Sequence, residues 1–225
     1  MGRERVEYKR TGFKREYKKL FIIATEGEKT EKVYFSNLFD SELVNSNSYY
    51  IEILPASDGK SSPRNVIKRL DKFKEEYKLY QEDELWMLID RDSWDAKQLN
   101  EIARECSQKS YNLAVSTPCF ELWLLLHKKD VSMLSRDEKQ KLLDNKKVNK
   151  NRTYIETQII EEFGTYNKSM PNCSLFLPHI NTAVSNSIKL ITNPKARWSE
   201  ELSTYVYKLV VKLLKIPTSE INRTI

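Results

Sequence analysis

Four acidic side chains carry the strongest chemical signal in this sequence of 225 residues. Asp90 and Asp92 belong to a D-R-D segment that follows the apolar run 85–89, and Glu26 and Glu121 follow other short apolar runs. In an extended chain, alternate side chains lie on the same side, so Asp90 and Asp92 can converge on one point. Converging carboxylates repel each other and need protons, a basic partner or a hard cation.

An all-oxygen set of carboxylates favours Mg²⁺ or Mn²⁺ over Zn²⁺. Such a site holds one metal or two and can clamp a phosphodiester for attack by water. Glu26 can instead act as a general acid or base, and Glu121 is expected near a helix N-terminus, which stabilises a carboxylate. The alternative is a solvated turn in which Arg91 neutralises the D-R-D acids.

The elements that must position these acids alternate along the chain. Short apolar runs predict strands at 20–25, 49–54, 84–89 and 111–115. Helical spacing predicts helices at 30–39, 63–80, 95–109 and 118–127. This order is typical of an α/β fold with a central parallel sheet of about four strands flanked by helices. All four acids follow predicted strands, so we expect them at the carboxyl edge of the sheet, where such folds bind ligands.

The chain divides into three expected parts: a basic N-terminal arm (1–19), an α/β core (20–130) and a helical C-terminal subdomain (131–225). After residue 127 the strand pattern nearly stops, and helices are predicted at 135–143, 151–163, 174–191 and 199–215. Thr117 and Pro118 are suited to begin the helix at 118–127, and Gly164 is suited to end the helix at 151–163.

The net charge of +6 is unevenly distributed. Residues 1–19 hold eight basic against three acidic side chains, and residues 128–152 hold nine against four, so the remainder is about −4. Basic segments beside an acidic body favour a polyanionic partner, although Lys-rich surfaces also serve solubility alone. The candidate nucleic-acid contacts are basic side chains near the expected edge or in the arm: Lys60, Arg64, Arg91, Lys168, Lys9, Arg10, Lys14 and Arg15.

Several classes of protein are disfavoured. No apolar run approaches the roughly 20 residues of a membrane span, and the first residues lack the apolar segment of a secretory signal. Three separated cysteines fit free thiols, so we expect a cytoplasmic protein without disulfides. His127 is interpreted as a helix C-terminal residue, with proton transfer as the alternative. The segment S-D-G-K-S at 57–61 lacks the first glycine of a P-loop, so no bound nucleotide is expected.

Four segments stand out together: A-T-E-G-E-K-T-E (24–31), L-I-D-R-D (88–92), S-T-P-C-F-E-L-W-L-L-L-H (116–127) and G-T-Y-N-K (164–168). Together they resemble the RloB-like proteins, a bacterial family associated with phage defence and a Toprim-type catalytic core. The resemblance implies a Toprim-like sheet and a divalent-metal site at Glu26, Asp90 and Asp92. It gives Glu121, in the Phe-Glu-x-Trp element, a supporting role, and it makes Asp95 a candidate third acid at a different spacing.

The resemblance implies a Mg²⁺-dependent nuclease that acts on RNA, including tRNA, or on DNA, as the effector of an ATPase partner in abortive infection. The competing interpretation is a non-catalytic regulatory or nucleic-acid-binding subunit of such a complex. Strand transfer through a tyrosine would need a further module. A homo-oligomer is left open.

Overall fold

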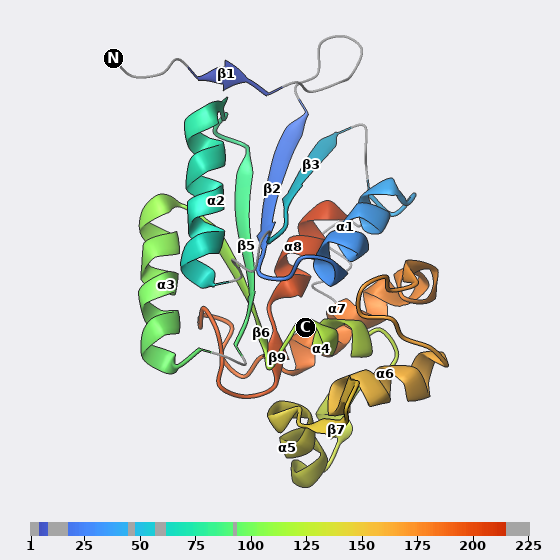
Figure 1. Ribbon diagram of the computed structural model, residues 1–225. Helices are drawn as coiled ribbons and strands as arrows, with labels where there is room; N and C mark the ends of the chain where they lie inside the picture. The colour runs from blue at the N-terminus through green and yellow to red at the C-terminus, as the bar shows by residue number, and fades with distance from the viewer. Residues whose placement is uncertain (1–4, 9–17, 45–47, 57–61, 92–93, 215–225) are drawn as a thin grey trace.

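A mixed α/β architecture with a central, mostly parallel sheet is seen in the computed structural model, which describes residues 5–8, 18–44, 48–56, 62–91 and 94–214 (Figure 1). The sheet has the strand order β3-β2-β5-β6-β9, and only β9 runs antiparallel to its neighbour. Its strands are β2 (Lys19–Thr25), β3 (Tyr49–Leu54), β5 (Glu84–Asp90), β6 (Asn112–Thr117) and β9 (Ser203–Thr204). The predicted fold class is confirmed, and β9 adds a strand that the sequence pattern did not indicate.

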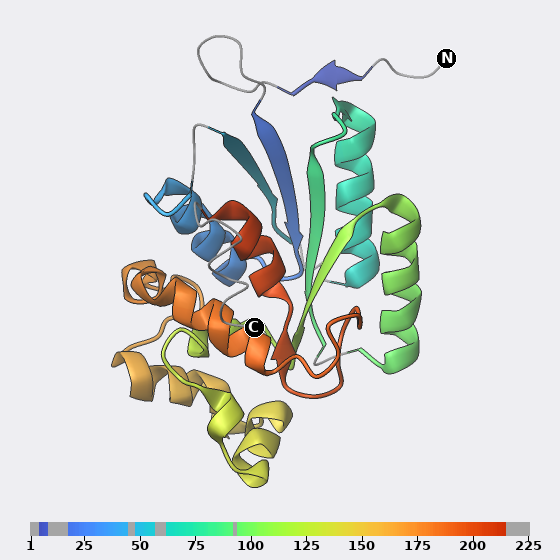
Figure 2. The ribbon, with the colours of Figure 1, turned by 180° about the vertical axis from the view of Figure 1, so that it is seen from behind.

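Helices cover both faces of the sheet (Figures 1 and 2). Helices α2 (Pro63–Glu76) and α3 (Ala96–Lys109) lie on one face, while α1 (Thr30–Asp40) and α8 (Val206–Leu213) lie on the other. The central strands are apolar throughout because alternate side chains enter two different cores. In β2, Leu20 and Ile22 pack beneath α2 and α3, whereas Phe21 and Ile23 pack toward α1.

The order of the strands places a switch point between β2 and β5. From β2 the chain crosses through α1 to β3 on one side, and it then returns through α2 to β5 on the other side. Helix α1, which follows β2, and helix α3, which follows β5, therefore lie on opposite faces of the sheet. This arrangement opens a crevice beyond the carboxyl ends of these two strands. The residues that follow β2 and end β5 are Glu26 and Asp90.

The chain after β6 packs against the α1 face and closes below the sheet (Figure 1). Its helices are α4 (Glu121–Leu125), α5 (Arg136–Asp144), α6 (Tyr154–Phe163) and α7 (Ile180–Lys189). Its shorter elements are the hairpin β7 (Lys147–Asn149) and β8 (Arg152–Thr153), and 3₁₀ turns at Val131–Met133, Cys173–Leu175 and Leu177–His179. Buried side chains from both sides of residue 130 form one cluster, so the predicted boundary there does not separate two cores.

Four helix starts differ from the predictions by three or more residues, and one of these is the helix expected from 151, which begins at Tyr154 after β8. Thr117 is not a cap: it ends β6 and its hydroxyl donates to the Ser199 carbonyl (2.8 Å), so α4 begins only at Glu121. The helix expected from 174 begins at Ile180, because Pro178 lies in a preceding 3₁₀ turn and cannot donate a helical hydrogen bond. The helix expected from 199 begins at Val206, after β9. Gly164 ends α6 in the left-handed conformation (φ 80°), as predicted.

The described part of the N-terminal arm packs on the body. Strand β1 (Val6–Glu7) pairs in parallel with β4 (Tyr77–Lys78). The ring of Tyr8 contacts Tyr50 and Phe73, and its hydroxyl donates to Glu52. Four predicted nucleic-acid contacts, Lys9, Arg10, Lys14 and Arg15, lie outside the described residues. Among the helices that are described, none is long and apolar enough to cross a membrane.

His127 is a neutral core residue. It is fully buried, and its Nδ1 lies 2.9 Å from the Trp123 carbonyl, which can only accept, so Nδ1 carries the proton. The Tyr34 hydroxyl then donates to Nε2 at 3.1 Å. Burial lowers the pKa of His127 to about 3. The ring therefore serves packing and hydrogen bonding within the core.

We expect His127 to make the protein less stable in mild acid. Its pKa is lower in the folded than in the unfolded chain, so the unfolded chain binds the proton first as the pH falls. The free energy of unfolding should drop by about 1.4 kcal/mol per pH unit between the unfolded pKa of about 6.5 and the folded value. Urea unfolding at about pH 7 and about pH 5 measures this slope. His127→Gln should lose this contribution and His179→Gln should keep it; equal slopes in both variants would contradict the assignment.

Candidate active site

Glu26 is held at the end of two neighbouring strands. Its main-chain N–H donates to the Leu88 carbonyl (3.0 Å), which continues the pairing of β2 with β5 by one residue. Its side chain then turns toward β5: Oε2 accepts the main-chain N–H of Asp90, and Oε1 accepts the indole N–H of Trp94, both at 3.1 Å. These two hydrogen bonds fix the Glu26 carboxylate in orientation at the edge of the sheet.

Asp90 ends β5 and lies half-buried beside Glu26. Directly after it, the Arg91 main-chain N–H donates to the Ser116 carbonyl (2.9 Å), and the Arg91 guanidinium lies 3.5 Å from the Glu200 carboxylate. Arg91 thus makes an ion pair with the C-terminal segment, and its predicted contact with nucleic acid stays a prediction. Asp92 lies outside the described residues.

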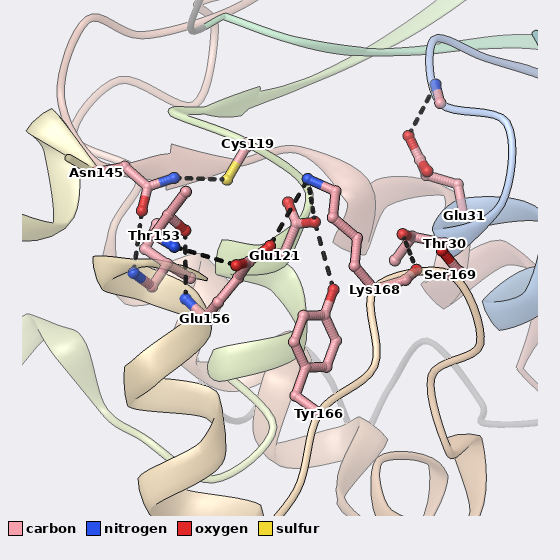
Figure 3. Close-up of polar contacts among 12 residues, drawn as sticks. Thr30, Glu31, Cys119, Glu121, Asn145, Thr153, Glu156, Tyr166, Lys168 and Ser169 are labelled. Carbon is pink, nitrogen blue, oxygen red and sulfur yellow. Dashed lines mark hydrogen bonds and ion pairs between the residues drawn. The ribbon is translucent and has the colours of Figure 1, made fainter. Parts of the chain in front are cut away.

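Glu121 is the most deeply buried of the predicted acids, with 3% of its surface exposed at the start of α4. Its Oε1 lies 2.9 Å from the Lys168 amino group and accepts a hydrogen bond from the Tyr166 hydroxyl at 3.3 Å (Figure 3). The same amino group lies 4.0 Å from Glu156, whose carboxylate also caps α6. Burial alone would lower the pKa of Lys168, but the Glu121 carboxylate raises it above its usual value.

The loop that carries Lys168 is attached to α1. The buried Thr30 hydroxyl donates to the main-chain carbonyl of Lys168 at 2.6 Å (Figure 3). Thr30 is the first residue of α1, and its side chain makes this long-range contact. This hydrogen bond joins residues 138 positions apart in the sequence and holds Lys168 over the cleft.

The Glu31 carboxylate also lies at this site, although the sequence pattern did not indicate it. Glu31 is in the first turn of α1, is 6% exposed, and accepts the Gly27 main-chain N–H at 3.1 Å. Burial raises the pKa of the Glu31 carboxyl, and the nearby Glu121 carboxylate raises it further. An acid in the first turn of a helix that follows a strand lies at the same edge of the sheet as the end of that strand. The position of Glu31 in the predicted helix at 30–39 could therefore have indicated its place at the site.

Gly27 leaves the space that the Glu31 carboxylate occupies. A Cβ added to Gly27 would lie 2.2 Å from Glu31 Oε2. We expect Gly27→Ala to displace that carboxylate, to break its hydrogen bond and to destabilise the protein by about 1–3 kcal/mol, as overpacking usually does. In urea unfolding, adding Glu31→Ala should restore part of the loss, because the clashing atoms are then absent. Strictly additive effects of the two substitutions would show that no clash exists.

A cleft of about 430 Å³ contains these groups. The structure brings Glu26, Asp90, Glu121 and Lys168 to the cleft, together with Glu31. Among the described residues, the lining is Glu26, Gly27, Glu28, Lys29, Thr30, Glu31, Asp90, Phe120, Glu121, Lys168 and Ser169. Arg64 lies elsewhere, in an exposed ion pair with Glu101 (3.7 Å), and Lys60 is outside the described residues. Asp95 caps α3 by accepting the Gln98 N–H at 2.8 Å.

The carboxylate oxygens of the cleft are the type of ligand that a hard cation prefers. Within the described ranges, no three Asp, Glu, His or Cys side chains converge closely enough to hold a metal ion, and Asp92 does not belong to those ranges. Mg²⁺, however, is commonly held by only one or two carboxylates, and water and substrate phosphates complete its shell. Glu26 and Asp90 supply two carboxylates on neighbouring strand ends, so the residues present fit Mg²⁺ or Mn²⁺.

A family model described as "RloB-like protein" matches residues 21–213. The chain belongs to the RloB-like family. In this RloB-like chain the match runs from the third residue of β2 to the end of α8, so it includes the sheet except Lys19 and Leu20, and every cleft residue that the structure describes. No curated protein and no solved structure shows significant similarity to it.

Proposed function

We propose that this RloB-like protein is a Mg²⁺-dependent nuclease that hydrolyses phosphodiester bonds in RNA or DNA. Its proposed biological role is that of effector in an anti-phage, abortive-infection system with an ATPase partner. The observation that carries the proposal is the fixed Glu26 carboxylate beside Asp90 at the switch point of a parallel sheet.

The charge of the cleft supports the need for a cation. The lining residues that the structure describes include five carboxylates and two lysines. An anionic phosphodiester would be repelled by this excess unless a cation entered with it. Glu26 and Asp90 are the residues that would hold Mg²⁺ or Mn²⁺, which when bound supplies charge neutralisation and a more acidic water.

The other side chains orient the substrate. A lysine amino group has three N–H donors, so Lys168 can bond to Glu121 and still donate to a phosphate oxygen. Its side chain is 60% exposed, which leaves it accessible from the cleft. Glu121 acts on Lys168 by fixing its position. The Trp94 and Asp90 N–H groups hold Glu26 in one orientation, where it can accept a proton from the attacking water.

The experiment that tests this function is incubation of the purified protein with total RNA and with plasmid DNA. Each substrate is treated with Mg²⁺, with Mn²⁺ and with EDTA, in the presence and absence of the cognate ATPase. Gel analysis should show cleavage that requires the divalent cation. Cleavage that is equal in EDTA would exclude the metal-dependent mechanism.

The second candidate is a non-catalytic regulatory or nucleic-acid-binding subunit of an ATPase-containing defence complex. It is favoured by one observation, the lack of a three-ligand metal cluster within the part of the chain that the structure describes. No cleavage under any of the conditions above, together with stoichiometric binding to the ATPase, would support this function and overturn the first.

A further inference from the structure

A second cavity of about 260 Å³ lies between the start of α2 and the body of α3. Its apolar lining includes Pro63, Trp94, Leu99 and Ile102, of which all but Trp94 are buried. Arg64 and Glu101 line it as exposed residues and form an ion pair with each other at 3.7 Å. The cavity is thus apolar inside and polar at its rim, the usual arrangement of a small-ligand site.

Trp94 connects this cavity to the cleft that holds the carboxylates. Its ring packs against the apolar cluster beneath α2 and α3 and lines the cavity. Its indole N–H donates to Glu26 Oε1 at 3.1 Å. A ligand in contact with the Trp94 ring is therefore separated from the Glu26 carboxylate by a single side chain.

The charges around the cavity indicate which ligand fits. Besides the pair of Arg64 and Glu101, the lining includes Glu105, which lies 3.4 Å from Lys109. Among the lining residues that the structure describes, two carboxylates accompany one guanidinium; this set disfavours a phosphate inside the cavity and favours a ligand that donates N–H groups to the carboxylates. An indole ring and aliphatic walls favour a flat aromatic group. A neutral nucleobase with an amino group has all of these properties.

We propose that this cavity binds the amino-bearing base, cytosine, adenine or guanine, of a nucleotide in the strand whose phosphate faces Glu26. The inference rests on the proposed function in that the ligand is a nucleic acid. Trp94 stacks on the base and at the same time holds the carboxylate, so it is a positioning residue for Glu26. Stacking of a base on an aromatic side chain contributes about 1–3 kcal/mol, which corresponds to about 5–150-fold in affinity.

The test is a metal-free binding measurement with fluorescently labelled single-stranded RNA octamers in EDTA. Octacytidylate, octauridylate and an octamer of abasic ribose phosphates have the same backbone and differ only in their bases. We expect octacytidylate to bind the wild-type protein at least about fivefold more tightly than the abasic chain. It should also bind more tightly than octauridylate, because cytosine offers an amino group to the rim carboxylates where uracil offers a carbonyl.

Three variants assign the effect to Trp94. Trp94→Leu should reduce the preference for cytosine over the abasic chain to less than about twofold, whereas Trp94→Phe, which keeps an aromatic ring, should retain it. Trp198→Leu is the matched control, because Trp198 packs against the same cluster but does not line the cavity. Equal affinity of the wild-type protein for octacytidylate and the abasic octamer overturns the proposal without any variant. Equal effects of Trp94→Leu and Trp198→Leu overturn it as well.

Two further comparisons distinguish a base in a strand from a free nucleotide, and the cavity proposal from the nuclease proposal. Tighter binding of cytidine 5′-monophosphate than of octacytidylate would mean that the ligand is a free nucleotide, and the assignment to a strand would be wrong. Base-dependent binding without cleavage under any condition would refute the nuclease and support the cavity. Cleavage with base-independent binding would refute the cavity and leave the nuclease intact.

Discussion

Glu26→Gln is expected to slow metal-dependent cleavage of nucleic acid by about 10²–10⁴-fold, the range typical for loss of a general acid or base. The amide removes the negative charge that a cation or a proton needs. It also places an NH₂ group against one of two N–H donors, Asp90 N and Trp94 Nε1, so one of the two hydrogen bonds that fix the side chain is lost. Asp90→Asn should have an effect of the same order.

The matched control is Glu82→Gln, an exposed acid before the opposite end of β5. It should cleave at the wild-type rate. Initial rates at saturating Mg²⁺ and thermal unfolding of each variant separate loss of chemistry from loss of folding. Wild-type rates in both Glu26→Gln and Asp90→Asn would place the chemistry outside the cleft.

Lys168→Met is expected to lower the free energy of unfolding more than Glu121→Gln does, although both changes break the same ion pair. Removing Lys168 leaves the Glu121 carboxylate, 3% exposed, without its cation, whereas removing the charge of Glu121 leaves an amino group that is already 60% exposed. Loss of one partner of a fully buried pair costs about 3–5 kcal/mol. Because Lys168 is largely exposed, we expect about 2 kcal/mol for Lys168→Met and about 1 kcal/mol for Glu121→Gln.

Lys189→Met is the matched control. It breaks an ion pair with Asp130 (2.6 Å) whose carboxylate is more exposed than that of Glu121, so it should cost less than about 1 kcal/mol. Urea unfolding of the three variants at neutral pH measures the losses. Equal losses in Lys168→Met and Lys189→Met would show that the burial of the Glu121 carboxylate does not set the cost.

Local sequence pattern predicted the sheet well for a physical reason. Strands buried on both faces, such as β2 and β5, need nearly continuous apolar residues, and a polar residue at their end then marks the edge of the sheet. Glu26 and Asp90 were found in this way. The fifth strand was missed because β9 has only two residues, Ser203 and Thr204, and owes its existence to pairing with β6.

Long-range contacts explain most of what the sequence did not reveal at the site. Trp94 donates a hydrogen bond to Glu26, 68 positions away in the sequence, and Thr30 donates one to Lys168, 138 positions away. The periodicity of apolar residues does not predict either contact. Gly27 and Glu31 lie four residues apart, but their contact depends on how α1 begins after β2. Arg64 lies in the first turn of α2, within the predicted helix, and it lines the second cavity because α2 packs next to α3.

The hydrogen bond from Thr30 to Lys168 joins two parts of the cleft that are far apart in the sequence. Glu26 and Asp90 belong to the sheet, whereas Lys168 belongs to the loop between α6 and α7 and reaches the cleft only while that loop stays in place. Opening a local segment costs less free energy than unfolding the whole chain. Release of this loop would therefore remove Lys168 from the cleft at a fraction of the cost of global unfolding. Hydrogen exchange would record it as early exchange of the loop while α6, α7 and the strands, which share one core, remain protected.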